Sequence, residues 1–125
     1  MISLDSVVAL TNGFVTVDKL NSLQYIKGEE SDYWLKYVEH ATMKAVLLST
    51  KAHDLICSYN QGVKSNGVFV PAIDLKEGDI IDTTYGQDIL INRVELNYYG
   101  MVGLHMKSGH FLANGFILLR ENGKN

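Results

Sequence analysis

Cysteine and proline are nearly absent from this chain, which has one of each, Cys57 and Pro71. A single cysteine excludes an internal disulfide and any metal site built from several thiolates. A chain without disulfides is typical of a reducing compartment, so we expect the cytoplasm. The lone proline follows the apolar run Val68-Phe69-Val70 and ends it, because proline has no N–H to donate to a β-ladder.

Excess positive charge and long apolar runs are also missing. Lys and Arg number 11 against 14 Asp and Glu, and the formal net charge is −3. The chain therefore has no basic footprint for nucleic acid or for an anionic membrane surface. No apolar run reaches the roughly 18 residues of a membrane span. No basic stretch followed by a long apolar segment opens the chain, so we expect no secretory signal. Neither nucleic acid nor membrane is an expected partner.

Short apolar runs separated by turn signals are what the chain does have. Its 125 residues, 46% of them hydrophobic, suit one domain with its own core. Asn12-Gly13 predicts a hairpin over residues 6–18, and Asn66-Gly67 predicts a second turn. Residues 32–43 allow a helix capped by Asp32, although their Tyr, Trp and Val residues favour a strand. This pattern predicts an all-β barrel or sandwich, and no convincing internal repeat is visible.

Four motifs carry a resemblance to a known family. They follow one another along nearly the whole chain: Asp5-Ser6-x-Val8 with Asn12-Gly13, Thr50-x-x-His53, Leu75-x-x-Gly78-Asp79, and Phe111-x-Ala113-Asn114-Gly115. Each is weak alone, but their order and spacing resemble the hedgehog/intein (Hint) family of self-processing domains. The resemblance implies a compact, horseshoe-like all-β fold of many short strands over residues 1–120. Residues 121–125 are then a polar C-terminal tail.

The resemblance places the family nucleophile at Met1. Hint chemistry begins when a Cys or Ser at this position attacks the preceding carbonyl, which requires a thiol or a hydroxyl. The thioether of Met1 has no proton to give up and cannot be acylated in this way. A shifted nucleophile at Ser3 is an alternative, displaced by two residues.

Thr50-x-x-His53 resembles the Thr-x-x-His motif of the family. In the family, the His of this motif is the general acid that protonates the departing amide nitrogen. We therefore expect both chain ends to lie beside Thr50 and His53. His110 lies close to another family His but is one position off, and Gly103 stands where the family has an acidic residue.

The C-terminal junction departs further from the family. Inteins end in His-Asn, and the Asn side chain cyclises to release the downstream segment. The matching positions here are Leu119 and Arg120, and neither side chain can cyclise. Asn122 and Asn125 lie beyond, but each requires an insertion to take that role. Asn114-Gly115 is chemically able to form a succinimide, although a turn explains it better.

The leading hypothesis is therefore a Hint module that is inactive in splicing and serves a larger protein, for example of a phage or mobile element, as a structural or interaction domain. The first alternative is a self-processing domain in which Met1 has replaced the nucleophile. The second is an unrelated small β-barrel adaptor. Expected partners are the flanking segments of its own polypeptide or another protein, with no cofactor and no metal. A phage origin would make the protein virion-associated rather than cytoplasmic.

Overall fold

The structure, a computed structural model, describes residues 1–21 and 24–121. These residues form twelve strands and two short 3₁₀ helices, and every strand pairing is antiparallel. The elements are β1 (Ile2–Ser3), β2 (Val7–Leu10), β3 (Gly13–Thr16), η1 (Val17–Lys19), β4 (Tyr25–Lys27), β5 (Asp32–Thr50), β6 (Asp54–Ser58), β7 (Gly62–Ser65), β8 (Val68–Pro71), η2 (Ala72–Asp74), β9 (Ile80–Thr83), β10 (Gly86–Met106), β11 (His110–Ala113) and β12 (Phe116–Leu119). The predicted all-β class is confirmed.

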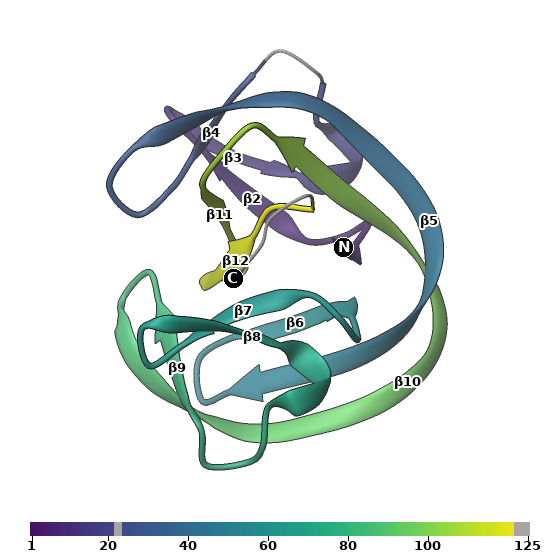
Figure 1. The fold of residues 1–125 in the computed structure, drawn as a ribbon, viewed down its shortest axis with the longest axis vertical. Coiled ribbons are helices and arrows are strands. Elements are labelled where there is room, and N and C mark those ends of the chain that lie inside the picture. Colours follow the sequence, from purple (N-terminus) through teal and green to yellow (C-terminus); the bar gives the residue numbers. More distant parts are fainter. Residues whose placement is uncertain (22–23, 122–125) are drawn as a thin grey trace.

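Two long strands, β5 and β10, frame the molecule. They pair from Leu90 opposite Thr50 to Met106 opposite Leu35, with register shifts after Leu90, Glu95 and His105. Such irregularities bend a ribbon and increase its twist. The ribbon consequently curves around one side of the molecule in Figure 1 and joins an upper group of strands (β2, β3, β4, β11) to a lower group (β6 to β9). The helix alternative for residues 32–43 is wrong, because these residues belong to β5.

The two groups repeat one arrangement that the sequence did not reveal. In each, a hairpin is followed by a 3₁₀ turn, a short strand and then a long strand: β2-β3-η1-β4-β5 and β7-β8-η2-β9-β10. Both 3₁₀ turns bury an apolar residue at their start, Val17 in one and Ala72 in the other. Few residues are identical between the two segments, among them Phe14-Val15 with Phe69-Val70 and Leu20 with Leu75.

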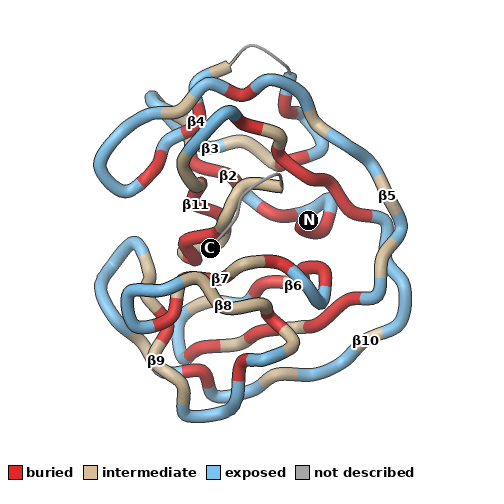
Figure 2. The backbone as a smooth tube through the Cα atoms, in the orientation of Figure 1, coloured by how far each residue is buried: buried red, intermediate tan, exposed pale blue. Residues whose placement is uncertain are grey.

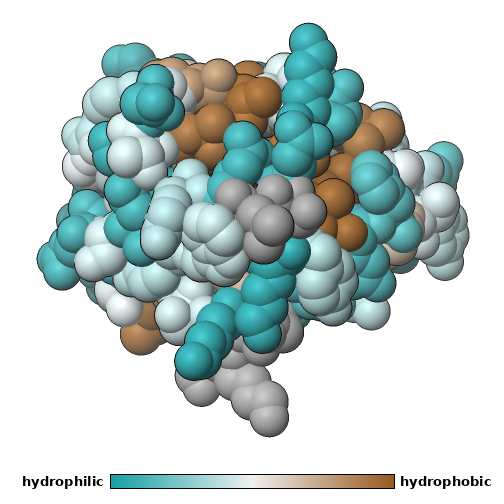
Figure 3. Space-filling model, turned by 90° about the horizontal axis from the view of Figure 1, so that it is seen from above, coloured by the Kyte–Doolittle hydropathy of each residue, from teal (hydrophilic) through white to brown (hydrophobic). Residues whose placement is uncertain are grey.

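One apolar core fills both groups. It includes Ile2, Val8, Leu48, Leu90 and Phe116, each fully buried or nearly so. Buried residues lie near the ends of the two long strands, at Leu35 and from Ala45 to Thr50 in β5 and at Leu90 and from Met101 to Met106 in β10. Residues 36–44 and 91–100, which form the middle of the ribbon, are exposed or half-buried (Figure 2). Seen from above in Figure 3, the apolar residues at the surface form separate patches divided by hydrophilic side chains.

Asn-Gly pairs close two of the hairpins, as predicted for Asn66-Gly67. Asn66 and Gly67 have φ values of 47° and 89°, and Asn114 and Gly115 have values of 50° and 85°. Two successive positive φ values define the type I′ turn, whose twist matches that of the flanking strands. The turn explanation of Asn114-Gly115 therefore agrees with the backbone. No helix within the described ranges has the length and apolar character that crossing a membrane requires.

We predict that Gly115→Ala destabilises the fold more than the matched variant Gly67→Ala. The two glycines share nearly the same φ, so each variant bears a strain of about 1–2 kcal/mol. An added Cβ meets nothing within 4 Å at Gly67, but it lies 2.8 Å from the His53 ring at Gly115. Overpacking should therefore cost about 1–3 kcal/mol more at Gly115.

Urea unfolding of both variants measures this difference. The double variant His53→Ala, Gly115→Ala should return to the level of Gly67→Ala. Equal midpoints for Gly67→Ala and Gly115→Ala would show that His53 does not pack on this turn.

Candidate functional site

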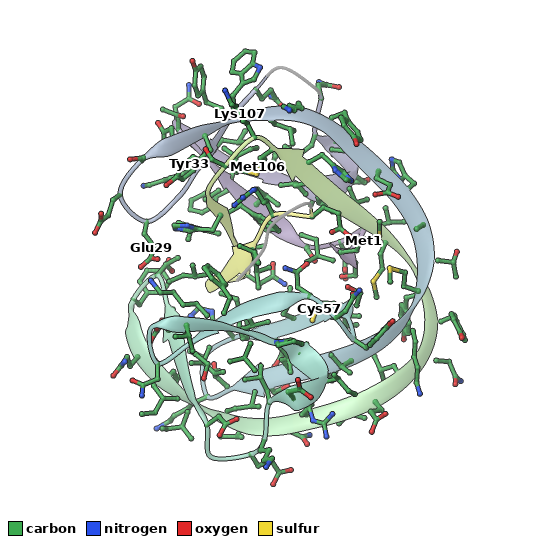
Figure 4. The ribbon with its side chains drawn as sticks, viewed as in Figure 1. Met1, Glu29, Tyr33, Cys57, Met106 and Lys107 are labelled. Carbon is green, nitrogen blue, oxygen red and sulfur yellow. The ribbon has the colours of Figure 1, made fainter. Side chains whose placement is uncertain are left out.

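The two ends of the described chain meet in the middle of the molecule. Strand β1 lies between β6 and β10, where Ile2 pairs with Cys57 and with Val102. Strand β12 enters the same region from the other side, between β7 and β9. Figure 1 shows the N-terminus and β12 between the upper and lower groups of strands, and Figure 4 places Met1 and Cys57 there. The expectation that the ends approach each other is confirmed.

The amino nitrogen of Met1 has three polar partners. It donates to Ser58 Oγ at 3.0 Å and to Gln61 Oε1 at 2.7 Å, and it lies 3.2 Å from Glu121 Oε2. The Met1 carbonyl accepts from the backbone N–H of Ser58 at 2.8 Å. Ser58 and Gln61 are buried, so these hydrogen bonds are shielded from water and leaving one unmade would be costly.

Gln61 joins the two ends of the chain through one side chain. Its Oε1 accepts from Met1, while its Nε2 donates to the carbonyl of Leu119 at 2.9 Å and to that of Gly62 at 3.0 Å. A small polar cleft of about 80 Å³ opens at this place and is lined by Met1, Asn60, Gln61, Gly62, Leu119, Arg120 and Glu121. We call this group of residues, together with Ser58, the junction cluster.

The Met1 side chain points away from the polar partners. It is 4% exposed and packs in an apolar cluster with Ala45 and Met101, flanked by Met43 and Ile56. Methionine fills irregular gaps of this kind well, because its unbranched chain adapts to the space. The position expected for the nucleophile is therefore a packing position in this chain.

Thr50 and His53 lie together, but away from Met1. The His53 N–H donates to Thr50 Oγ1 at 3.1 Å, in the turn that links β5 to β6. The His53 ring stacks on Tyr85 with centroids 5.6 Å apart and meets Phe116 edge-on. Ser58 is five residues further on, roughly 16 Å along an extended strand. The expectation that His53 reaches the N-terminal strand is therefore corrected.

The residues that do contact the nitrogen of residue 1 have the same spacing. Ser58-x-x-Gln61 matches Thr-x-x-His in length, with a hydroxyl followed three positions later by a side chain that hydrogen-bonds the nitrogen. The sequence interpretation missed this pair because neither residue is the family's own. Its usable signal was its position, directly before the hairpin β7–β8 and its Asn66-Gly67 turn.

His110 lies in a different cluster. Its Nε2 accepts from the Glu29 N–H at 3.2 Å and lies 3.4 Å from the Glu29 carboxylate, which also holds Lys64 at 2.6 Å. Burial lowers the pKa of His110 below its usual value, and the Glu29 charge partly opposes this. Figure 4 shows Glu29 on the opposite side from Met1, so the structure does not bring His110 to the junction cluster.

Leu119 and Arg120, which match the family's His-Asn positions, contribute a backbone carbonyl and a guanidinium group. Leu119 offers its carbonyl to Gln61, and Arg120 Nη1 donates to the Gly109 carbonyl at 2.9 Å. Asn114 binds Val7 N–H through Oδ1 and the Asp54 carbonyl through Nδ2, so it ties strands together. Asn122 and Asn125 lie outside the described residues.

Ser3 and Cys57 are a further hydroxyl and a thiol close to residue 1. Ser3 is buried and donates to Asp5 Oδ1 at 2.6 Å, so its hydroxyl is engaged within its own turn. Cys57 is fully buried, and burial raises the pKa of its thiol to about 12. Across residues 1–21 and 24–121, no three His, Cys, Asp or Glu side chains come together as metal ligands would.

Solved intein structures share this fold over nearly their whole length. The VidaL intein superposes with a TM-score of 0.86 and 17% identity, over 98% of this chain and 97% of that chain. A DnaB intein from Synechocystis sp. PCC 6803 gives 0.85 and 17%, over 96% and 97%. The gp41-1 intein gives 0.85 and 14%, over 94% and 95%. No protein-family model and no curated protein matches the chain. The fold is therefore that of the intein, or Hint, splicing domains.

We predict that Cys57 is inert in the folded protein. With a pKa of about 12, only ~10⁻⁴ of the thiol is ionised at pH 8, and the thiolate is the reactive form. Ellman's reagent at pH 8 should therefore give no rapid reaction with the folded chain. It should give one equivalent after unfolding in guanidinium, where the pKa returns to about 8.5. Rapid labelling of the folded protein would contradict the buried position of this thiol.

Proposed function

We propose that this chain, which has the fold of the intein splicing domains, is a Hint module that holds its splice-junction geometry but does not splice. In this proposal it serves as a structural or interaction domain within a larger protein, for example of a phage or mobile element. Its partners are the segments that flank it or a second protein. The observation that carries the proposal is the contact of the Met1 nitrogen with Ser58 and Gln61.

In this proposal the α-ammonium nitrogen of Met1 marks the place that the nitrogen of a scissile peptide bond takes when a segment precedes residue 1. Ser58 and Gln61 therefore occupy the place of the family's Thr-x-x-His pair, and Thr50 and His53 do not. Gln61 accepts a hydrogen bond from this nitrogen, but a side-chain amide does not titrate near neutral pH and cannot pass it a proton. A neutral hydrogen-bonding group in place of the His supports retained geometry without general-acid catalysis.

The other two steps lack their reacting groups. The Met1 thioether has no proton to lose, and its side chain is packed among apolar residues rather than free to attack a carbonyl. Arg120 stands where the cyclising Asn is needed, and its guanidinium is bound to the Gly109 carbonyl. Three separate losses, at residues 1, 61 and 120, support an inert module more strongly than the nucleophile alone.

The second candidate is a self-processing domain in which Met1 has replaced the nucleophile. The same contact favours it, since Ser58 and Gln61 would hold the scissile nitrogen of an active enzyme equally well. The unrelated β-barrel adaptor no longer stands as an alternative, because the fold is the Hint fold. The setting, cytoplasmic or virion-associated, depends on the host protein.

We predict that the chain neither splices nor cleaves itself when a reporter domain is fused to each end. The intact mass should persist for days, with or without a strong thiol, because residue 1 offers no nucleophile. Met1→Cys should allow slow, thiol-dependent release of the N-terminal reporter. Met1→Cys with Gln61→His should release it on the order of 10² times faster, because a general acid then faces the leaving nitrogen.

Two controls separate the contributions of these residues. Met1→Ala with Gln61→His lacks the nucleophile and should stay intact. His53→Ala in the Met1→Cys, Gln61→His background should release the reporter at an unchanged rate. Thiol-dependent release from the unmodified chain would instead favour the self-processing candidate. In every variant the C-terminal reporter should stay attached, since Arg120 has no amide to cyclise.

A further inference from the structure

Strand β10 has no side chain at Gly103, close to residue 1. The side chain of Glu121, which follows β12, occupies the space that this leaves. Gly103 lies next to Val102, the partner of Ile2 in the pairing of β1 with β10. A Cβ at Gly103 would lie 2.9 Å from the Glu121 side chain, at its Cγ, Cδ and Oε2 atoms. The absence of a side chain at Gly103 therefore makes the room that the Glu121 carboxylate occupies.

Glu121 is held in this place from two sides. Its backbone N–H donates to the Leu104 carbonyl at 2.9 Å, and its carboxylate forms an ion pair with the α-ammonium group of Met1 at 3.2 Å, with 20% of the Glu121 side chain exposed. The sequence placed Glu121 in a polar tail, but the structure seats it on β10. The remainder of that predicted tail, residues 122–125, lies outside the described residues.

We propose that Glu121 is a positioning residue for the nitrogen of residue 1, supplied by the C-terminal flank in place of an acidic residue on β10. This inference rests on the proposed function, because it assigns the junction cluster to the scissile bond. If Glu121 has this role, the set of groups around the nitrogen of residue 1 is complete only when the residue that follows β12 is bound to β10.

A carboxylate at this place gains a chemical role once residue 1 carries a thiol, as in the Met1→Cys fusion. When a thiol at residue 1 attacks the preceding carbonyl, a carbon–sulfur bond forms, the carbon–nitrogen bond breaks, and the thiol proton ends on the nitrogen. The resulting amine takes a second proton from solvent and becomes an ammonium, which carries three N–H donors. Ser58 Oγ, Gln61 Oε1 and Glu121 Oε2 are three oxygens around that nitrogen, and only Glu121 carries a charge. The carboxylate stabilises the positive charge that develops on the nitrogen.

The activity test uses the Met1→Cys, Gln61→His fusion and its thiol-dependent release. Glu121→Ala and Glu121→Gln should each slow release by on the order of tenfold, because the Gln variant keeps the shape but loses the charge. Glu95→Ala removes an exposed carboxylate paired with Lys44 on the same long ribbon and should have no effect. Moving the carboxylate back to β10, with Gly103→Asp and Glu121→Ala together, should restore most of the rate. An unchanged rate in Glu121→Gln would overturn the proposal.

A stability test decides the placement of Glu121 without any activity. In the otherwise unmodified chain, Gly103→Ala should lower the urea midpoint strongly when Glu121 is present and much less when Glu121→Ala has cleared the space. Such non-additivity is the sign of direct contact. An equal loss in both backgrounds would overturn the proposal. If the Met1→Cys, Gln61→His fusion releases no reporter, the proposed function is wrong in its claim that the splice-junction geometry is retained. The placement of Glu121 is then tested by the stability measurements on Gly103→Ala and Glu121→Ala alone.

Discussion

The antiparallel pairing of β5 with β10 is the constraint on which the rest of this structure depends. Each strand is long enough to serve both groups of strands, and their shared register shifts bend the ribbon around the core. Because β6 continues from β5 in a hairpin, the ribbon leaves a gap between β6 and β10 that β1 fills. The position of residue 1 is thus a consequence of pairing between residues far apart in sequence.

The junction cluster follows from that gap. Residue 1 enters a buried position with a donor nitrogen that needs acceptors, and Ser58 and Gln61 lie at the end of β6 and in the turn after it. Gln61 satisfies the incoming nitrogen with its oxygen and the outgoing Leu119 carbonyl with its nitrogen. An amide has a donor and an acceptor in one group, so a single side chain ties both ends of the chain without any charge.

Local signals in the sequence predicted most of the fold, and long-range register explains what they missed. Asn66-Gly67 gave its hairpin because a type I′ turn depends on two adjacent residues. Thr50-x-x-His53 was matched to the family on its residue types, its spacing and its order among the four motifs, yet the same residues also close the β5–β6 turn. Choosing between it and Ser58-x-x-Gln61 requires the pairing of Ile2 with Cys57, which no local pattern contains. Glu121 was missed for the same reason, since its contact with Gly103 joins a terminal residue to the middle of β10.

A glutamine and a histidine at residue 61 would differ little in the hydrogen bond that they make to the nitrogen of residue 1, but they differ greatly in their ability to transfer a proton to it. Gln61 Oε1 accepts a hydrogen bond from the α-ammonium nitrogen of Met1 at 2.7 Å, a contact that an imidazole nitrogen is also able to make. Only the histidine changes its charge near neutral pH and transfers a proton. Folding depends on the hydrogen bonds and on burial, whereas catalysis depends on proton transfer. The polar contacts between the two ends of this chain therefore stabilise the fold whether or not a bond is cleaved there, and this is the basis on which the proposed function separates structure from catalysis.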